Sequence, residues 1–385
     1  MSLRKENWNQ IRFDEVADCL ERHSKNPIID GFDRYVGLED INGETLRIES
    51  SGEIAKGTTF TKIFNNGDIL FGKRRPYLRK IAVADFNGIC SGDILVFRNK
   101  KSILPELLPI YVSSQSFINY AIKTSAGSLS PRTKWKDLAK FDILLPPIEE
   151  QRQIATLFQS IEAAINKIEI QKKNIKSLWL KLIDEFVSER PSFGNLLENR
   201  NLQTVTYAEV TEKLMRRIDP ISYGIERIVA GENLESEDFR VRTWQIVGKG
   251  YLGPAFHVLF KPGDILYGSR RTYLKKVASA HFEGVCANTT YVIRAKEKLL
   301  LQDLLKHIML SDRFTKYSIG VSKGSTNPYI NWKDLDNFTF QIPDNETQKK
   351  ISEVLDDVVN LIENLKTQQA LLKSLKQKIL NEIFS

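Results

Sequence analysis

Two long stretches of the chain place apolar residues at every seventh position. The first follows Pro146 and Pro147 and runs to about Phe186 without glycine or proline. Its seam consists of Ile154, Ile161, Ile168, Ile175 and Leu182, and Leu157, Phe158, Ile165, Leu178, Trp179 and Phe186 widen the seam into a stripe. This pattern, built from strong helix formers, predicts a coiled-coil or bundle helix of roughly 55–60 Å.

The same pattern returns 197 residues later, from about Asn345 onward. The second seam consists of Ile351, Val358, Leu365, Leu372 and Ile379. A glutamine interrupts both rows at the same place, as Gln171 and as Gln368. The two glutamines either fix the register of a helix pair or face solvent where the seam is loose.

Short strand-like runs, separated by Gly, Asn and Ser turns, fill the chain before each long helix. Residues 103 to about 124 are expected to form one helix between these runs. The segment 64–90 aligns without gaps on 260–286, and 16 of the 27 positions are identical. The sequence therefore predicts one α+β fold with a mostly antiparallel sheet, used twice.

This repeat divides the chain into four parts. Globular domains are expected over residues 1–145 and 191–342, and long helices over 146–190 and 343–385. Each helix needs a partner for its apolar seam, and the other helix can supply it. We expect antiparallel pairing, because parallel pairing would strain the connection around Pro191.

Composition adds a preference for an anionic partner. The net charge is +8 and the pI is about 9.1, which favours nucleic acid, although a merely basic protein has the same balance. Cys19, Cys90 and Cys286 form no metal-binding or disulfide pattern, and the latter two are equivalent positions expected to be buried thiols. No stretch of 18 apolar residues occurs, so no membrane contact and a cytoplasmic location are expected.

A basic run with one tyrosine occurs at the same place in both halves, where phosphates would find closely spaced cations. The expected DNA contacts of the first domain are Lys73, Arg74, Arg75, Tyr77, Arg79, Lys80, Arg132 and Lys134. Those of the second are Ser269, Arg270, Arg271, Tyr273, Lys275, Lys276, Lys323, Thr326, Asn327 and Tyr329. A solvated basic surface is the alternative, which the repetition in register disfavours.

Positions that are identical in both halves cannot distinguish two DNA sequences, so they suit phosphate contacts or maintenance of the fold. Positions that differ could read bases. These are Lys73/Ser269, Pro76/Thr272, Arg132/Tyr329, Lys134/Asn331 and the segments 91–93/287–289.

Motifs for catalysis are weak. Asn327-Pro328-Tyr329 is similar to a motif of DNA amino-methyltransferases but lacks one proline, and its counterpart is Ser130-Pro131-Arg132. The four histidines have no metal spacing, and no phosphate-binding GxxxxGK[ST] loop occurs. We expect no catalytic or metal site, and Trp135 and Trp332 are expected to anchor the two cores.

The chain resembles the specificity subunits of type I restriction–modification systems. The resemblance rests on the segment 145–155, LPPIEEQRQIA, which leads into the first long helix, and on the GDILFGKRR…YLRK…ADFNG…SGDI pattern. The second copy, IPDNETQ, departs from the first by one proline and one acid, which leaves open whether both helices bind a partner equally.

This resemblance implies two target-recognition domains, separated by an antiparallel coiled coil with a pseudo-twofold internal repeat. Each domain would read one half of a bipartite site in double-stranded DNA, and the helices would set the gap between the halves. Two methyltransferase subunits and restriction/translocase subunits would bind as partners. S-adenosylmethionine, ATP and Mg would belong to those partners, with no cofactor on this chain. A coiled-coil scaffold with protein-binding ends and a self-contained methyltransferase or nuclease are the rival interpretations.

Overall fold

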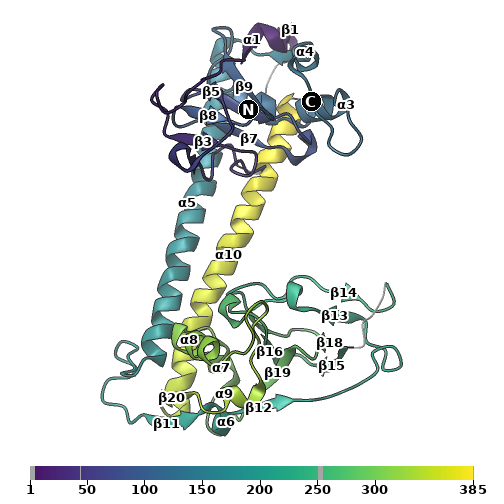
Figure 1. Cartoon of the computed structure of the whole chain (residues 1–385). Coiled ribbons are helices and arrows are strands. Elements are labelled where there is room, and N and C mark those ends of the chain that lie inside the picture. The colour runs from purple at the N-terminus through teal and green to yellow at the C-terminus, as the bar shows by residue number, and fades with distance from the viewer. Residues whose placement is uncertain (1–4, 44, 250–254, 385) are drawn as a thin grey trace. The chain divides into compact units, whose positions relative to one another are not determined.

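The computed structural model describes residues 5–43, 45–249 and 255–384 (Figure 1). The chain forms two compact units, unit 1 from Met1–Glu169 with Gln368–Ser385, and unit 2 from Ile170–Thr367. Each unit therefore contains one globular domain and a part of both long helices.

In the described part of unit 1, ten strands and four short helices precede the first long helix. The strands are β1 (Asn9–Arg12), β2 (Ala17–Leu20), β3 (Arg34–Val36), β4 (Gly52–Glu53), β5 (Lys62–Phe64), β6 (Ile69–Gly72), β7 (Ile81–Val83), β8 (Gly88–Cys90), β9 (Ile94–Asn99) and β10 (Asp142–Leu145). The helices are α1 (Phe13–Val16), α2 (Leu108–Ser113), α3 (Gln115–Lys123), α4 (Trp135–Leu138) and the long α5 (Ile148–Val187), with 3-10 turns η1 (Lys5–Asn7), η2 (Ile54–Lys56) and η3 (Pro76–Leu78).

Unit 2 repeats this order. Its strands are β11 (Gln203–Thr206), β12 (Thr211–Leu214), β13 (Arg227–Val229), β14 (Gln245–Ile246), β15 (Phe256–Phe260), β16 (Ile265–Gly268), β17 (Val277–Ser279), β18 (Gly284–Ala287), β19 (Thr290–Ala295) and β20 (Thr339–Ile342). Its helices are α6 (Tyr207–Val210), α7 (Gln302–Ile308), α8 (Asp312–Gly320), α9 (Trp332–Leu335) and the long α10 (Asn345–Phe384), with 3-10 turns η4 (Gly231–Asn233) and η5 (Thr272–Leu274).

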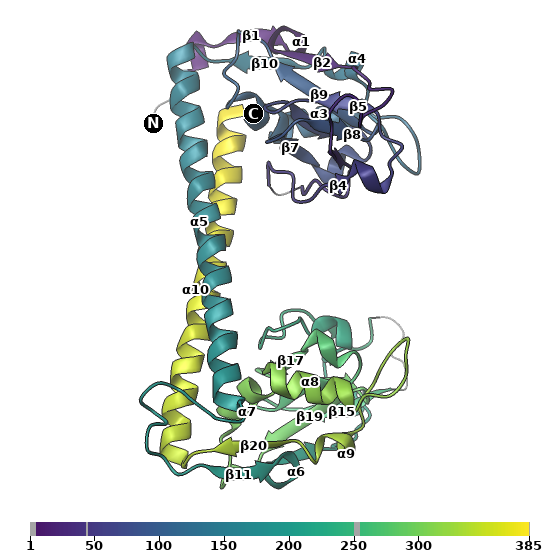
Figure 2. The same cartoon turned by 60° about the vertical axis from the view of Figure 1, so that its left-hand side comes forward.

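The sheets confirm the duplicated, mostly antiparallel α+β fold (Figure 2). Unit 1 has the orders β1-β10, β2-β9-β6-β7 and β4-β3-β8-β5, and unit 2 has the corresponding β11-β20, β12-β19-β16-β17 and β14-β13-β18-β15. Only the pairs β3/β8 and β13/β18 are parallel among the described strands. In both units the first and last strands of the domain pair directly before the long helix begins.

The central strand of each domain separates two cores. Ile69 and Phe71 of β6 pack in the core under the helices, while Leu70 packs in the core on the other side. Ile265, Tyr267 and Leu266 of β16 repeat this division. Both faces are apolar, so these strands lack the polar alternation of a surface strand.

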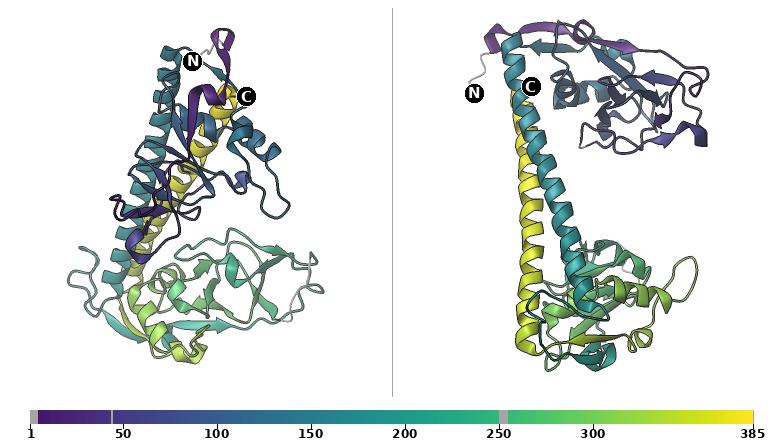
Figure 3. Two further views of the ribbon diagram at one scale, coloured as in Figure 1. Left: turned by 45° about the horizontal axis from the view of Figure 1, so that its top comes forward. Right: turned by 90° about the vertical axis from the view of Figure 1, so that its left-hand side faces the viewer.

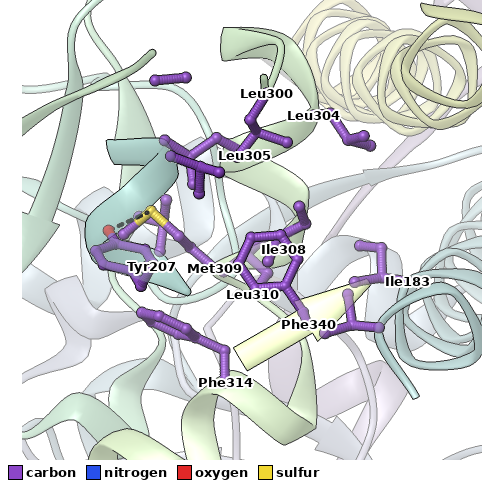
Figure 4. Close-up of a cluster of buried hydrophobic side chains, with 14 of the residues drawn as sticks. Ile183, Tyr207, Leu300, Leu304, Leu305, Ile308, Met309, Leu310, Phe314 and Phe340 are labelled. Carbon is purple, nitrogen blue, oxygen red and sulfur yellow. Dashed lines mark hydrogen bonds between the residues drawn. The ribbon is translucent and has the colours of Figure 1, made fainter. Parts of the chain in front are cut away.

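The expected core anchors are confirmed. Trp135 and Trp332 are partly buried and pack against the helical cores of their units. Cys90 and Cys286 are buried free thiols, and burial raises the pKa of each to about 12. In the unit 2 core, drawn in Figure 4, Ile183 of α5 lies with residues of α7, α8 and β20.

A buried glutamine anchors the first turn of each long helix. The Gln151 side-chain amide donates to the Pro146 and Ser102 carbonyls, and its oxygen accepts the Leu104 N–H. Gln348 makes the same three contacts with Pro343, Leu299 and Leu301. Asp344 caps α10 by accepting the Thr347 N–H at 3.0 Å, so the second copy begins its helix without a second proline.

The helices pair antiparallel, as predicted from their seams. In unit 1, Glu162 of α5 binds Lys376 of α10, and Glu169 accepts a hydrogen bond from Gln369 at 2.6 Å. Seven residues forward along α5 therefore correspond to seven residues backward along α10. In unit 2, where α5 and α10 run side by side (Figure 3), Ile183 and Phe186 share a core with Ile351 and Leu355.

Fewer residues of the seam are buried than the sequence predicted. Ile154, Ile161, Ile351 and Leu365 are buried, but the other six predicted seam residues are only partly buried. Leu178 is 52% exposed, so its assignment to the buried stripe was wrong. Gln171 and Gln368 lie three residues after the seam positions Ile168 and Leu365 rather than on the seam, and both are exposed, which supports the solvent-facing alternative over a register-fixing role.

The single helix predicted over 103–124 was also wrong. The segment is divided into α2 and α3 at Ser114, whose backbone is extended. The Ser114 hydroxyl caps α3 by accepting the Phe117 N–H. Ser311 repeats this cap before α8. Among the described residues, no helix combines the length and the apolar character that a membrane span needs.

Candidate nucleic-acid interface

Most of the predicted basic residues lie on one turn in each domain, which connects β6 to β7 in unit 1 and β16 to β17 in unit 2. We call residues 73–80 and 269–276 the basic turns. Each contains a 3-10 turn, η3 or η5, flanked by residues of left-handed backbone conformation. Pro76 and Thr272 at the start of these 3-10 turns are buried, while Tyr77 and Tyr273 are 50% and 51% exposed.

A second loop lies along each basic turn. We call residues 124–134 and 321–331 the proline loops. In unit 1 the Arg75 N–H donates to the Pro131 carbonyl at 2.7 Å, and the Thr133 N–H donates to the Lys73 carbonyl. In unit 2 the Arg271 N–H donates to the Pro328 carbonyl, also at 2.7 Å. Segments about 55 residues apart in sequence thus form one exposed surface in each domain.

In unit 1 an acid organises part of this surface. The Asp93 carboxylate accepts from Arg132 at 3.0 Å and lies 3.8 Å from Arg74. The hydrogen bond from Arg132 lowers the pKa of Asp93 below its usual range. Arg74 also donates to the Ser130 hydroxyl at 2.5 Å. Asp93 therefore holds Arg74 of the basic turn beside Arg132 of the proline loop.

Unit 2 lacks this acid. Thr289 occupies the place of Asp93, and Tyr329, 43% exposed, occupies the place of Arg132. The side chains of Arg270 and Arg271 are exposed and make no hydrogen bond or ion pair with any residue that the structure describes. The two domains thus present different side chains on the same backbone frame.

The structure does not bring all predicted contacts to this surface. Arg79 donates to Gln115, and Lys80 donates to the Leu38 and Ile41 carbonyls. In unit 2, Lys275 pairs with Asp312 at 2.5 Å and Lys276 donates to the Gly231 carbonyl at 2.5 Å. These four half-buried cations are therefore engaged by other groups of their own domains.

The residues predicted to read bases, and the other predicted contacts on the proline loops, also divide into buried or half-buried residues and exposed residues. Ser269 is buried and donates to the Thr289 carbonyl, and Pro76 and Thr272 are buried as well. Lys73 is half-buried, and Asn331 donates to Asp334. Lys134, Arg132, Thr326, Asn327 and Tyr329 are exposed, and Lys323, also exposed, pairs with Asp334 at 3.2 Å.

Sequence reasoning missed two features of the surface. It noted that segment 91–93 differs between the halves but not that Asp93 binds Arg132. It also missed Leu129, which is 90% exposed on the proline loop where unit 2 has Thr326. A leucine inside a Gly/Ser/Pro loop was the available signal, because a polar loop gives it no core to join.

The methyltransferase-like Asn327-Pro328-Tyr329 segment has a structural role. Its Pro328 carbonyl accepts the Arg271 N–H, just as the Pro131 carbonyl accepts the Arg75 N–H at the equivalent place in unit 1. Among the residues described, no group of three or more His, Cys, Asp or Glu side chains is placed to hold a metal ion.

Comparisons with known proteins point to one family. A family described as "Type I restriction modification DNA specificity domain" matches residues 5–177 and 222–374. The specificity subunit of the type I restriction enzyme EcoDI from Escherichia coli is 30% identical over 172 residues, which span 44% of this chain and 38% of that protein. The specificity subunit of MjaVIII from Methanocaldococcus jannaschii is 25% identical over 400 residues, covering 98% of this chain and 92% of its own length.

A solved structure gives the same result for the fold. It comes from work on complex assembly and conformational transition of the type I restriction–modification system. The likeness covers 98% of this chain and 97% of that chain, with a TM-score of 0.59 and 23% identity.

Proposed function

The chain belongs to the type I restriction–modification DNA specificity family, and we propose from this that each of its two domains reads one half of a bipartite DNA target. With two copies of the specificity domain, the chain is a DNA-recognition component rather than a catalytic one. The observation that carries the proposal is the duplicated basic turn, held by a proline loop through the same carbonyl in both domains.

Different side chains on this common frame would let the two domains read different half-sites. Unit 1 offers the Arg74–Asp93–Arg132 cluster, in which the carboxylate fixes the direction of two guanidinium groups. At the corresponding places unit 2 offers Tyr329 and Arg270, whose guanidinium group has no partner among the described residues. Oriented arginines suit guanine edges, whereas a tyrosine ring suits stacking or an apolar contact with thymine.

We further propose that the long helices bind two methyltransferase subunits. Each helix has a second seven-residue row, three residues after the seam, which we call the outer row. It consists of Leu157, Ala164, Gln171 and Leu178 on α5 and of Val354, Leu361, Gln368 and Leu375 on α10. Four of its apolar members are 41–52% exposed. A repeated row of exposed apolar side chains is typical of a surface that binds another protein. One row on each helix accounts for two copies of a partner.

The chemistry would then lie on the partners. Methyltransferase subunits would supply S-adenosylmethionine, and restriction subunits would supply ATP and Mg, in the cytoplasm where the chromosome is read. The paired helices would set the gap between half-sites, since their length is fixed by hydrogen bonding and not by the DNA.

Methylome sequencing tests the proposal. Cells that express this chain with its methyltransferase partner should methylate one motif of two short parts separated by a fixed gap. Cells with the partner alone are the control and should lack that motif. Methyl transfer by the purified chain alone would favour the enzyme interpretation. Stable assembly without any DNA sequence preference would favour the scaffold interpretation.

A further inference from the structure

Both basic turns contain two residues in the left-handed backbone region. They are Arg75 (φ 54°) and Arg79 (φ 51°) in unit 1, and Arg271 (φ 50°) and Lys275 (φ 48°) in unit 2. Of the non-glycine residues described, only Asn199 and Glu237 share this conformation. A long side chain at such a position costs conformational free energy that glycine would avoid. Its occurrence at equivalent places in both domains calls for a reason.

Contacts within the domain explain the left-handed conformation at the second position of each turn, Arg79 or Lys275. Arg79 donates to Gln115 at the start of α3, and Lys275 pairs with Asp312 at the start of α8. Their neighbours Lys80 and Lys276 donate to backbone carbonyls of a distant loop. These side chains connect the basic turn to the rest of the domain, and that contact offsets the strain.

No such contact explains the left-handed conformation at the first position, Arg75 or Arg271, among the described residues. The guanidinium groups of Arg75 and Arg271 are exposed and make no hydrogen bond or ion pair with any described residue. Their backbone is nevertheless fixed on both sides. The N–H groups donate to Pro131 and Pro328, and the carbonyls accept from Leu78 and Leu274 at 2.9 and 2.8 Å. A charged side chain is thus held on a rigid, strained backbone without serving the fold.

We propose that Arg75 and Arg271 are paired phosphate anchors, one for each domain, and that Arg79, Lys80, Lys275 and Lys276 are internal supports that do not contact DNA. This inference rests on the proposed function and divides its basic turns into two roles. An arginine that is identical in both domains fixes the position of each domain on the DNA backbone and leaves the choice of sequence to its neighbours.

A separation of stability from binding follows. Arg75→Gly keeps the left-handed backbone without strain, so the unfolding temperature should equal or exceed that of the parent chain while a phosphate contact is lost. Arg75→Ala loses the same contact but keeps the strain. The two variants should therefore bind DNA equally weakly and differ in stability.

The experiment uses the full-length chain and a fluorescent duplex of random sequence, about 40 base pairs long. Anisotropy titrations from about 50 to 200 mM salt give the slope of log K against log salt, which falls by about one for each phosphate contact removed. We expect Arg75→Gly and Arg271→Gly each to reduce the slope by about one, and the double variant by about two. Lys80→Met is the matched control, which should keep the slope and lower the unfolding temperature.

Different results would overturn DNA recognition itself, the anchor assignment, or the division into anchors and supports. No salt-dependent binding by the parent chain would count against DNA recognition itself. Binding by the parent chain with an unchanged slope in both glycine variants would overturn the anchor assignment alone. A slope reduced as much by Lys80→Met as by Arg75→Gly would overturn the division into anchors and supports.

Discussion

His307 is a residue at which unit 2 departs from its internal repeat. Counting back from the capping Ser114 and Ser311, its equivalent in unit 1 is the buried Ile110. His307 is fully buried on α7, and its Nε2 lies 2.9 Å from the Asp356 carboxylate of α10. Its Nδ1 has no hydrogen-bond partner among the described residues. Burial lowers the pKa of this imidazole, and the neighbouring Lys306 also opposes a second positive charge.

A pH dependence of stability follows from that lowered pKa. Below about pH 6.5 an unfolded chain binds a proton at His307 that the folded chain does not, so stability falls as the pH drops. The loss should grow as the pH falls further below 6.5. Unfolding by denaturant at pH 8, 7, 6 and 5.5 measures it, and His307→Ile, the unit 1 residue, should remove this part of the pH profile. Parallel profiles for the two chains would contradict the assignment.

The candidate site was predictable at the residue scale only in part. Close spacing of cations in a repeated run identified Arg75 and Arg271, which are exposed. The same spacing gave no means to separate them from Lys80 and Lys276. Those lysines reach carbonyls near residues 38–41 and at Gly231, which lie about 40 residues away in sequence. Only the folded chain brings these groups together.

At the scale of elements, the long helices were predicted well because their evidence is local and repeated. The structure gives 40 residues to each, and both ends keep the offset of 197. The break between α2 and α3 was not predicted, because the apolar positions on both sides of Ser114 fit one helical stripe. A single side-chain cap overrode that periodicity.

The outer row makes a prediction at this scale. Changing Leu361 and Leu375 to Glu places two charges on the surface proposed to bind methyltransferase subunits. Burying these charges in an interface is costly, so we expect binding to weaken by at least about tenfold. Both leucines are 47% exposed, so the unfolding temperature should change little. Quantitative co-purification from co-expressing cells measures the effect.

The chain supplies a matched control for that test. Asn360 and Ser374 precede the two leucines by one residue and are exposed on the same helix. Changing both to Glu adds the same charge outside the row and should leave co-purification intact. Equal loss in both variants would mean that charge on α10, and not the outer row, determines partner binding.

For the whole molecule, the antiparallel pairing sharpens the idea that the helices set the gap between half-sites. Lengthening α5 alone would shift its register against α10 in one unit, as the Glu162–Lys376 and Glu169–Gln369 contacts show. A clean test therefore inserts one heptad in α5 after Glu169 and another in α10 after Thr367. Both units then keep their own helix contacts, since the insertions lie at the boundary between the units.

Seven helical residues add about 10 Å, which corresponds to about three base pairs of DNA at 3.4 Å each. We expect the doubly extended chain to lose methylation of the original motif and to prefer half-sites about three base pairs further apart. Methylome sequencing against a plasmid library of varied gaps measures the preference. The chain with an insertion in α5 alone is the control, and it should fail to methylate any member because one unit loses its helix pairing. Normal methylation of the original motif by the doubly extended chain would show that helix length does not set the gap between the half-sites.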